Sequence, residues 1–212
     1  MAKSTAFPGG RDLNHTWLAA VVLVYMVGLL IMRRMRHRLP GYLFSSFGLV
    51  AIIVLASKLG QWNEPLGAFQ AQIMVGAANL IGLKLGVLGP ASLVVPDPTG
   101  YSILRIEVEC STLIEATVFS GLLIFYPRFR PRERVIRLGA GIGATLLINL
   151  IRLGVIIGMV TVLGKPALPW AHAFVGRLVF FAGVVVLYWR MLTLPTLAVV
   201  MRDLEVSGRA VK

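Results

Sequence analysis

The chain has a single cysteine, Cys110, in the stretch Glu109-Cys110-Ser111-Thr112 at the start of an apolar run. A lone cysteine cannot form an intramolecular disulfide, so it is a packed thiol, a partner for another chain, or a nucleophile. A packed role is common, because cysteine is among the most buried residue types. The stretch becomes a candidate for chemistry only in combination with other polar residues.

Further polar residues lie in segments that are otherwise apolar. Charged groups inside membrane spans are rare and cost about 3 kcal/mol each on insertion scales, so each is a functional hypothesis. Here they are Glu115, Arg152 and Arg177. Asn149 lies three residues before Arg152, which places both on one helix face. His172 stands at the outer start of the last apolar segment.

A thiol, an imidazole and a guanidinium in one pocket can carry out acyl transfer. A neighbouring cation lowers the pKa of a cysteine and raises its thiolate fraction. Histidine can take the thiol proton and return it to a leaving amine, and a guanidinium can hydrogen-bond the oxyanion of a tetrahedral intermediate. The pattern therefore predicts a covalent thioacyl enzyme, resolved by water or by an amine. Arg152 lies about 16 Å below the predicted end of its helix, so a tilted helix or a recessed pocket is required.

Each of these residues also has a purely structural interpretation. Glu115 would then pair with Arg152 or Arg177, and Asn149 would bridge helices by hydrogen bonding. His172 alone is more often an interfacial residue satisfied by water. Two rival functions follow. One is a small transporter or channel component whose polar path is lined by Glu115, Arg152 and Arg177, and the other is a scaffold whose buried polar residues lock helix packing.

The composition indicates a membrane protein. Hydrophobic residues make up 57% of the chain and charged ones 14%, whereas about a quarter of the residues in soluble proteins are charged. Several runs approach the roughly 20 apolar residues that cross a bilayer. We expect an all-α, polytopic transmembrane helix bundle and one membrane-integral domain over residues 1–212. The net charge of +12 comes from basic clusters between apolar runs, which the positive-inside rule explains, so no nucleic-acid partner is expected.

Five membrane spans are predicted, over residues 16–32, 42–59, 110–126, 138–163 and 172–192. An arginine cluster follows the first span, whereas a signal peptide carries its charge ahead of its apolar region, so this span is predicted to be an uncleaved anchor. The positive-inside rule then places the N-terminus outside and the C-terminus inside. The remaining parts are a flexible external tail (1–15), an external region (61–109) and a cytoplasmic tail (193–212).

Residues 66–88 are moderately apolar but are interrupted by polar residues, namely Gln70, Gln72, Asn79 and Lys84. Residues 61–109 hold two basic and four acidic residues, whereas residues 127–137 hold five arginines and one glutamate. An odd number of crossings must separate an acidic outer region from a basic inner loop, and the span 110–126 supplies one. We therefore expect 66–88 to be an amphipathic or re-entrant external helix, with a sixth span as the alternative. The alternation over residues 101–108 predicts an exposed strand that leads to Cys110.

Three motifs, in order, resemble those of the exosortase/archaeosortase family of membrane-embedded cysteine transpeptidases. That family carries its Cys, Arg and His on three spans, in Cys-Ser-Gly, Asn-x-x-Arg and His-x-x-x-Gly contexts. The corresponding stretches here are Cys110-Ser111-Thr112, Asn149-Leu150-Ile151-Arg152 and His172-Ala173-Phe174-Val175-Gly176. The resemblance covers about residues 100–190, and Thr112 stands where the family commonly has glycine.

By that resemblance, Cys110 would be the nucleophile, Arg152 the stabiliser of the oxyanion or thiolate, and His172 the general acid and base. The supporting residues that we single out around them are Glu109, Ser111, Glu115, Asn149 and Arg177. The resemblance implies substrates that are exported proteins with a C-terminal sorting signal, made of a short motif, a transmembrane helix and a basic tail. It implies their cleavage at the external face of a prokaryotic plasma membrane, with a membrane lipid or surface amine as an acceptor besides water. No cofactor or metal motif is present in the sequence, and the oligomeric state stays open.

Overall fold

The computed structural model describes residues 10–34, 38–60, 63–106, 110, 112–126, 129–197 and 201, and most of these residues are helical. The helices are α1 (Gly10–Arg34), α2 (Arg38–Gly60), α3 (Asn63–Leu80), α4 (Leu113–Ile124), α5 (Pro131–Leu163), α6 (Leu168–Trp170) and α7 (Gly176–Tyr188). A 3-10 turn, η2 (Lys165–Ala167), and two π-helical turns, η3 (Ala171–Val175) and η4 (Trp189–Thr193), adjoin the last two helices. The strands are β1 (Gly86–Val87), β2 (Ser92–Asp97) and β3 (Gly100–Arg105).

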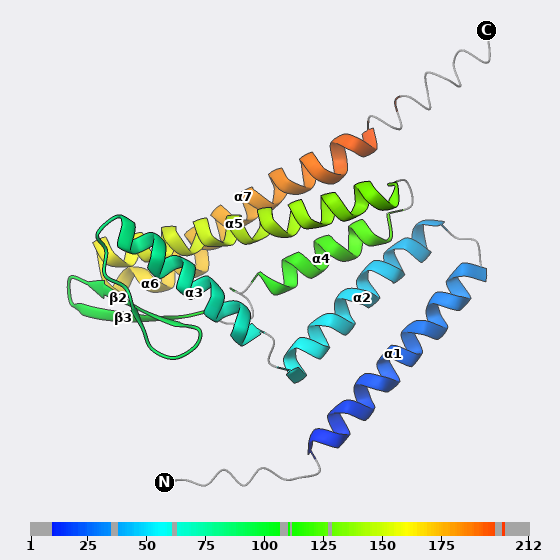
Figure 1. Ribbon diagram of the computed structural model, residues 1–212, viewed down its shortest axis with the longest axis horizontal. Coiled ribbons are helices and arrows are strands. Elements are labelled where there is room, and N and C mark those ends of the chain that lie inside the picture. Colours follow the sequence, from blue (N-terminus) through cyan, green and yellow to red (C-terminus); the bar gives the residue numbers. More distant parts are fainter. Residues whose placement is uncertain are drawn as a thin grey trace.

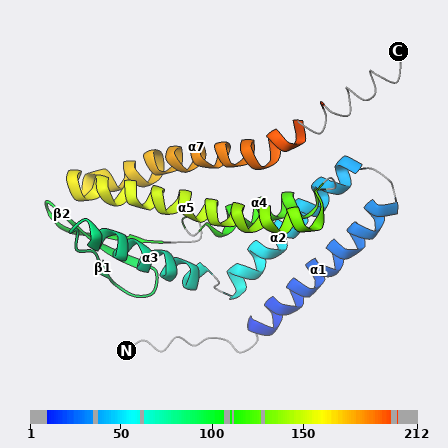
Figure 2. The same cartoon turned by 45° about the horizontal axis from the view of Figure 1, so that its top comes forward.

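The long helices are arranged so that each packs against the next (Figure 1). Helix α1 packs on α2, α2 on α4, α4 on α5, and α5 on α7. Figure 2 shows the same order from a second direction, with α3 and the strands beside one end of α5 and away from α1. The chain therefore has a helical layer and, at one end of it, a smaller cap made of α3 and the sheet.

The helical segments lie where the sequence predicts membrane spans. Three of them, Pro40–Ser57, Pro131–Leu163 and Ala167–Leu197, are long and apolar enough to cross a membrane, and two shorter apolar helices cover Trp17–Met32 and Leu113–Ile124. Helix α4 has 12 residues, so it is about 18 Å long and shorter than the roughly 30 Å of a bilayer core. The helical character of the fold is confirmed, whereas the number of crossings and their direction stay predictions.

The cap contains a three-stranded antiparallel sheet in the order β1-β2-β3, with Leu93 opposite Leu104. An all-α class is therefore wrong for this part of the chain. Strand β3 confirms the extended segment predicted ahead of Cys110, but β1 and β2 were not predicted. Strand β1 has only two residues, and Pro96 lies near the end of β2, where proline usually indicates a turn.

Asp97 closes the turn between β2 and β3. Its Oδ2 accepts a hydrogen bond from Ser102 Oγ at 2.6 Å, and its Oδ1 accepts one from the backbone N–H of Thr99 at 2.7 Å. The hydrogen bonds from Ser102 and Thr99 hold the pKa of Asp97 below its ordinary value, because they stabilise the ionised carboxylate. The turn is therefore held by a carboxylate that is charged at neutral pH.

Apolar side chains join the cap to the C-terminal part of α5. The inner face of the sheet packs in one buried cluster with residues of α3 and with the last three turns of α5. The cluster includes Leu93, Val95, Leu104 and Ile106 from the sheet region, Ala71, Met74 and Ala78 from α3, and Leu153, Ile156, Ile157 and Val160 from α5. Burial of each large apolar side chain stabilises the fold by about 1.5–3 kcal/mol. The helix predicted over 66–88 is confirmed only as far as Leu80, where α3 ends, and residues 86–87 form strand β1 instead. The position of α3 outside the membrane stays a prediction.

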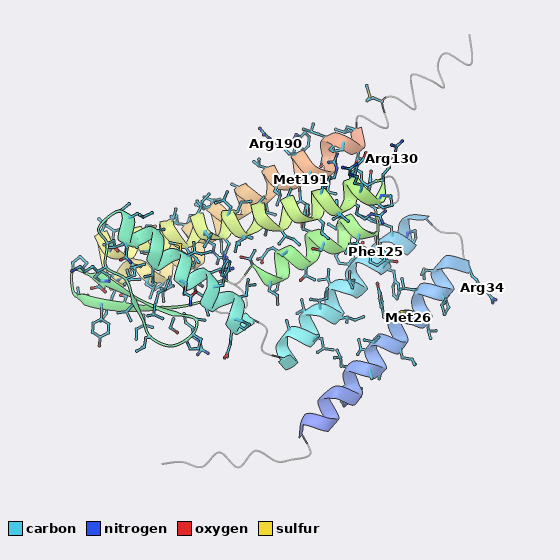
Figure 3. All side chains as sticks on the ribbon, viewed as in Figure 1. Met26, Arg34, Phe125, Arg130, Arg190 and Met191 are labelled. Atoms are coloured by element: carbon cyan, nitrogen blue, oxygen red, sulfur yellow. The ribbon has the colours of Figure 1, made fainter. Side chains whose placement is uncertain are left out.

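Arginines gather on the half of the helical layer away from the sheet. Figure 3 shows Arg34 at the end of α1, Arg130 before α5 and Arg190 near the end of α7, all on that half. Arg137 Nη1 donates to the carbonyl oxygen of Met191 at 3.2 Å, which ties the start of α5 to the turn η4 that follows α7.

Candidate active site

Cys110 lies between strand β3 and helix α4, where the cap meets the helical layer. Its side chain is only 2% exposed and belongs to the same buried cluster as Ile106. The backbone N–H of Ile106 donates to the carbonyl oxygen of Ala91, which extends the β2–β3 pairing to within four residues of the cysteine. Glu109 and Ser111, which we predicted as supporting residues, lie outside the described residues.

Arg152 approaches the sulfur from α5. Its Nη2 lies 3.5 Å from Cys110 Sγ, and its guanidinium carbon lies 5.6 Å from the centroid of the Phe180 ring. The side chain is 4% exposed, so the cation is held in a largely apolar environment where its charge acts strongly on its neighbours. The structure therefore brings the predicted guanidinium and thiol together.

The sequence predicts that Arg152 lies well below the end of its helix and so away from Cys110. That separation does not arise, because the cap packs along the C-terminal part of α5. The last three turns of α5 pack against the sheet, and the cysteine lies beside Arg152. Helix α4 begins only at Leu113, and Cys110 itself lies in a 3-10 turn, so the thiol precedes this helix rather than forming part of it. The cap therefore forms the recessed pocket that the depth of Arg152 requires. The prediction of a span over residues 138–163 did not include a cap.

His172 completes the set from the connection between α5 and α7. Its Nε2 lies 3.7 Å and its Nδ1 3.9 Å from Cys110 Sγ. The residue lies in the π-helical turn η3, and such turns frequently occur at functional sites. The imidazole is half-buried. The sulfur therefore lies within reach of both a base and a cation.

Asn149 fixes the backbone of the cysteine. Its Nδ2 donates to the carbonyl oxygen of Cys110 at 2.6 Å and to Oε1 of Gln70 at 3.0 Å. Since Asn149 and Arg152 lie three residues apart on α5, one helix face holds both the main chain and the side chain of Cys110. The interpretation of Asn149 as a bridge between helices is compatible with these contacts.

Gln70 and Thr112 were not predicted as site residues. Gln70 Nε2 donates to Oγ1 of Thr112 at 3.0 Å, and both side chains are buried. Thr112 is the only residue other than glycine with positive φ in the described part of the chain, at φ 68°. A side chain in this left-handed region costs roughly 1 kcal/mol or more, so the segment from Cys110 to Thr112 must be held by its surroundings.

A sequence signal for Gln70 exists in the helix pattern. Residues 70, 74 and 78 recur every four positions, and all three are buried in α3, whereas Gln72 and Asn79 are exposed. Gln70 is therefore a polar residue on the buried, otherwise apolar face of an amphipathic helix, a position where the side chain requires a hydrogen-bond partner. Thr112 carried a signal too, because it replaces the glycine that the motif commonly has.

Glu115 and Arg177 are less buried than Cys110 and Arg152. Glu115 lies in the first turn of α4 and is half-buried, and its Oε2 is buried without a hydrogen-bond partner among the described residues. Arg177 lies on α7, and its side chain is exposed. Within the described residues, no group of three or more His, Cys, Asp or Glu side chains could hold a metal ion.

The sequence matches the transmembrane exosortase family (Exosortase_EpsH) over residues 8–189. That range covers most of the 212 residues and includes the cysteine, arginine and histidine described above. Comparison with curated proteins and with solved structures gives no match.

Proposed function

The chain belongs to the transmembrane exosortase family, whose members are cysteine transpeptidase-type sorting enzymes, and we propose that it cleaves the C-terminal sorting signals of exported proteins with Cys110 as nucleophile. The single observation that carries this assignment is the position of the sulfur. Cys110 Sγ lies 3.5 Å from Arg152 Nη2 and 3.7 Å from His172 Nε2. These distances suit a thiolate that is stabilised by a cation and exchanges its proton with an imidazole.

In the proposed reaction, His172 takes the proton from the thiol. The thiolate then attacks the carbonyl carbon of the scissile peptide bond, and Arg152 stabilises the negative charge that develops on the oxygen. When the carbon–nitrogen bond breaks, His172 returns the proton to the leaving amine, and a thioester to Cys110 remains. Attack by water or by an amine on that thioester releases the product and regenerates the thiol.

Asn149 has a supporting role in this scheme. Its hydrogen bond to the Cys110 carbonyl fixes the main chain from which the sulfur projects. The thiol therefore does not have to be aligned anew in each cycle, which is the benefit of a preorganised site.

We propose that the cap and Cys110 face the cell exterior and that the chain spans the membrane five times, with its N-terminus outside. The arginines on the half of the layer away from the sheet support this orientation, since basic residues favour the cytoplasmic side. A substrate anchored by its own helix would then present its outer end at the level of the cap. The acceptor would be water, or an amine of a lipid or of the cell surface.

Co-expression with an exported protein that carries a C-terminal helix and a basic tail tests this function. We expect cleavage of that protein by the wild type and none by Cys110→Ala. Mass spectrometry of the wild type under acidic quench should find a thioester adduct at Cys110 that hydroxylamine removes. Cleavage that persists in Cys110→Ala would exclude the proposal, and a transporter or channel component would instead keep its activity in Cys110→Ser.

A further inference from the structure

Helix α3 contributes a buried carboxamide to the surroundings of the cysteine. Gln70 is 0% exposed, and each end of its side-chain amide has a partner. Its Oε1 accepts from Asn149 Nδ2, and its Nε2 donates to Thr112 Oγ1, each at 3.0 Å. Because a buried amide is stable only when it is hydrogen-bonded, these contacts fix the side chain in one orientation.

The direction of this hydrogen-bond chain is set by the cysteine itself. The carbonyl oxygen of Cys110 can only accept, so Asn149 must turn its NH₂ group toward it. The same NH₂ group also faces Gln70, so Gln70 must accept with its side-chain oxygen. The NH₂ group of Gln70 then donates to Thr112. A glutamine at position 70 satisfies both demands, and an apolar side chain satisfies neither.

This hydrogen-bond chain holds the main chain at the cysteine and again two residues beyond it. Asn149 holds the carbonyl of Cys110, and Gln70 holds the hydroxyl of Thr112, two residues further along. Thr112 needs such a tether, because its positive φ of 68° is a conformation that side chains other than glycine rarely adopt. The loop that carries the thiol is therefore held from α5 and from α3 together.

We infer that Gln70 is a positioning residue that keeps Cys110 aligned with Arg152 and His172. The inference rests on the proposed function only in taking Cys110 as the reactive thiol. It makes α3 a structural part of the active site, although α3 supplies none of the Cys, Arg and His set.

The single cysteine allows this role to be measured without any substrate. The full-length protein is treated with iodoacetamide in native membranes, and the alkylation rate of Cys110 is followed against pH. The maximal rate reports access to the thiol, whereas the midpoint of the profile reports how well its surroundings stabilise the thiolate. Among the described residues, Arg152 on α5 and His172 in η3 contact the thiol, and Glu115 in α4 interacts electrostatically with Arg152. All three, and the neighbouring Glu109, are retained in the variants below.

The comparison uses two glutamines of the same helix. We expect Gln70→Leu to raise the midpoint by about one pH unit, since the thiol loses its alignment with the guanidinium. Gln72→Leu, which alters an exposed side chain two residues away, should leave the midpoint unchanged. A midpoint in Gln70→Leu equal to that of the wild type would overturn the inference.

A second pair of variants tests the hydrogen bond between Gln70 and Thr112 at its acceptor. Thr112→Ser keeps the hydroxyl that receives the Gln70 hydrogen bond, and it should keep the wild-type midpoint. Thr112→Ala removes that hydroxyl and should raise the midpoint as Gln70→Leu does. Equal midpoints for Ser and Ala would count against the inference, and this pair remains informative if Gln70→Leu does not fold. If no exported protein is cleaved while these shifts are observed, the proposed function fails and the positioning role stands.

Discussion

In the proposed mechanism, the contact between Arg152 and Cys110 stabilises both partners. A guanidinium that is 4% exposed lacks the solvation that water would provide, and in the proposed mechanism a thiolate at Cys110, whose sulfur lies 3.5 Å from Nη2, adds a favourable negative charge beside it. The thiolate gains in turn, because a nearby cation favours the ionised form of cysteine. In the proposed mechanism, this mutual dependence gives Arg152 a chemical role that a helix-packing arginine would not have.

Replacement of this cation should therefore remove activity rather than the fold. We expect Arg152→Gln to lower the rate of substrate cleavage by roughly 10²–10³-fold, the usual effect of losing a donor to the oxyanion. Arg132→Gln is the matched control, since Arg132 lies in the first turn of the same helix α5 with an exposed side chain, and it should cleave at nearly the wild-type rate. Initial rates from purified full-length protein decide between them. Equal losses in the two variants would contradict the assignment of Arg152.

Residue types alone predicted which side chains to examine but not how the cysteine loop is held. Cys110, Arg152 and His172 were predicted because a thiol, a buried charge and an imidazole stand out in apolar segments. Gln70 was treated as an interruption of an apolar run, because its partners are 42 and 79 residues away in the sequence. A hydrogen bond between residues that distant depends on the packing of α3 against α5, which local patterns do not predict.

At the scale of the elements, α4 and α5 approach each other closely at a glycine. A methyl group added to Gly141 of α5 would lie 1.9 Å from Cε1 of Phe119 on α4. The Phe119 ring is 0% exposed and packs edge-on against Tyr188, with 5.6 Å between the ring centroids, so it cannot turn aside freely. The close approach therefore fixes how α4 lies along α5, and with it the start of α4 near Cys110.

A pair of glycines on α5 tests this packing. Gly141→Ala should destabilise the protein by about 1–3 kcal/mol, the typical result of forcing extra atoms into a packed interface. Gly143→Ala is the control, because nothing lies within 4 Å of its added methyl group, and its effect should stay within about 0.5 kcal/mol. Thermal unfolding of the two purified variants in detergent provides the comparison. A Gly141→Ala midpoint as high as that of Gly143→Ala would show that the helices are not closely packed there.

The elements themselves were predictable to the extent that their apolar runs are continuous. The helices around residues 16–32, 42–59 and 138–163 follow such runs, and they formed. The sheet was only partly predicted, since Leu93, Val95 and Leu104 belong to short strands that are stabilised by packing on α5 rather than by a long pattern. The short length of α4 was missed for a related reason. Its apolar run begins at Cys110, but the hydrogen bonds of Thr112 and Asn149 hold the first residues outside the helix.

At the scale of the whole molecule, the site and the arginine clusters occupy opposite parts. The thiol lies at the junction of the cap and the helical layer, whereas Arg34 and Arg130 lie at the far end of that layer. Helix α5 connects the two regions. Its 33 residues span about 50 Å, more than the roughly 30 Å of a bilayer core. A helix of this length can cross the membrane and still contribute its last turns to the cap.

This separation leads to a prediction about sidedness. In a Cys110→Ala background, a cysteine introduced by Arg105→Cys would lie on the exposed side of β3, and one introduced by Arg132→Cys would lie in the exposed first turn of α5. With right-side-out membrane vesicles and a membrane-impermeant maleimide, we expect labelling at position 105 and none at position 132, because the arginine-rich end favours the cytoplasm. Permeabilised vesicles should label at both positions, which controls for reactivity. Labelling at position 132 in sealed vesicles would reverse the orientation, and it would place Cys110 on the cytoplasmic side, where exported proteins could not reach it after translocation.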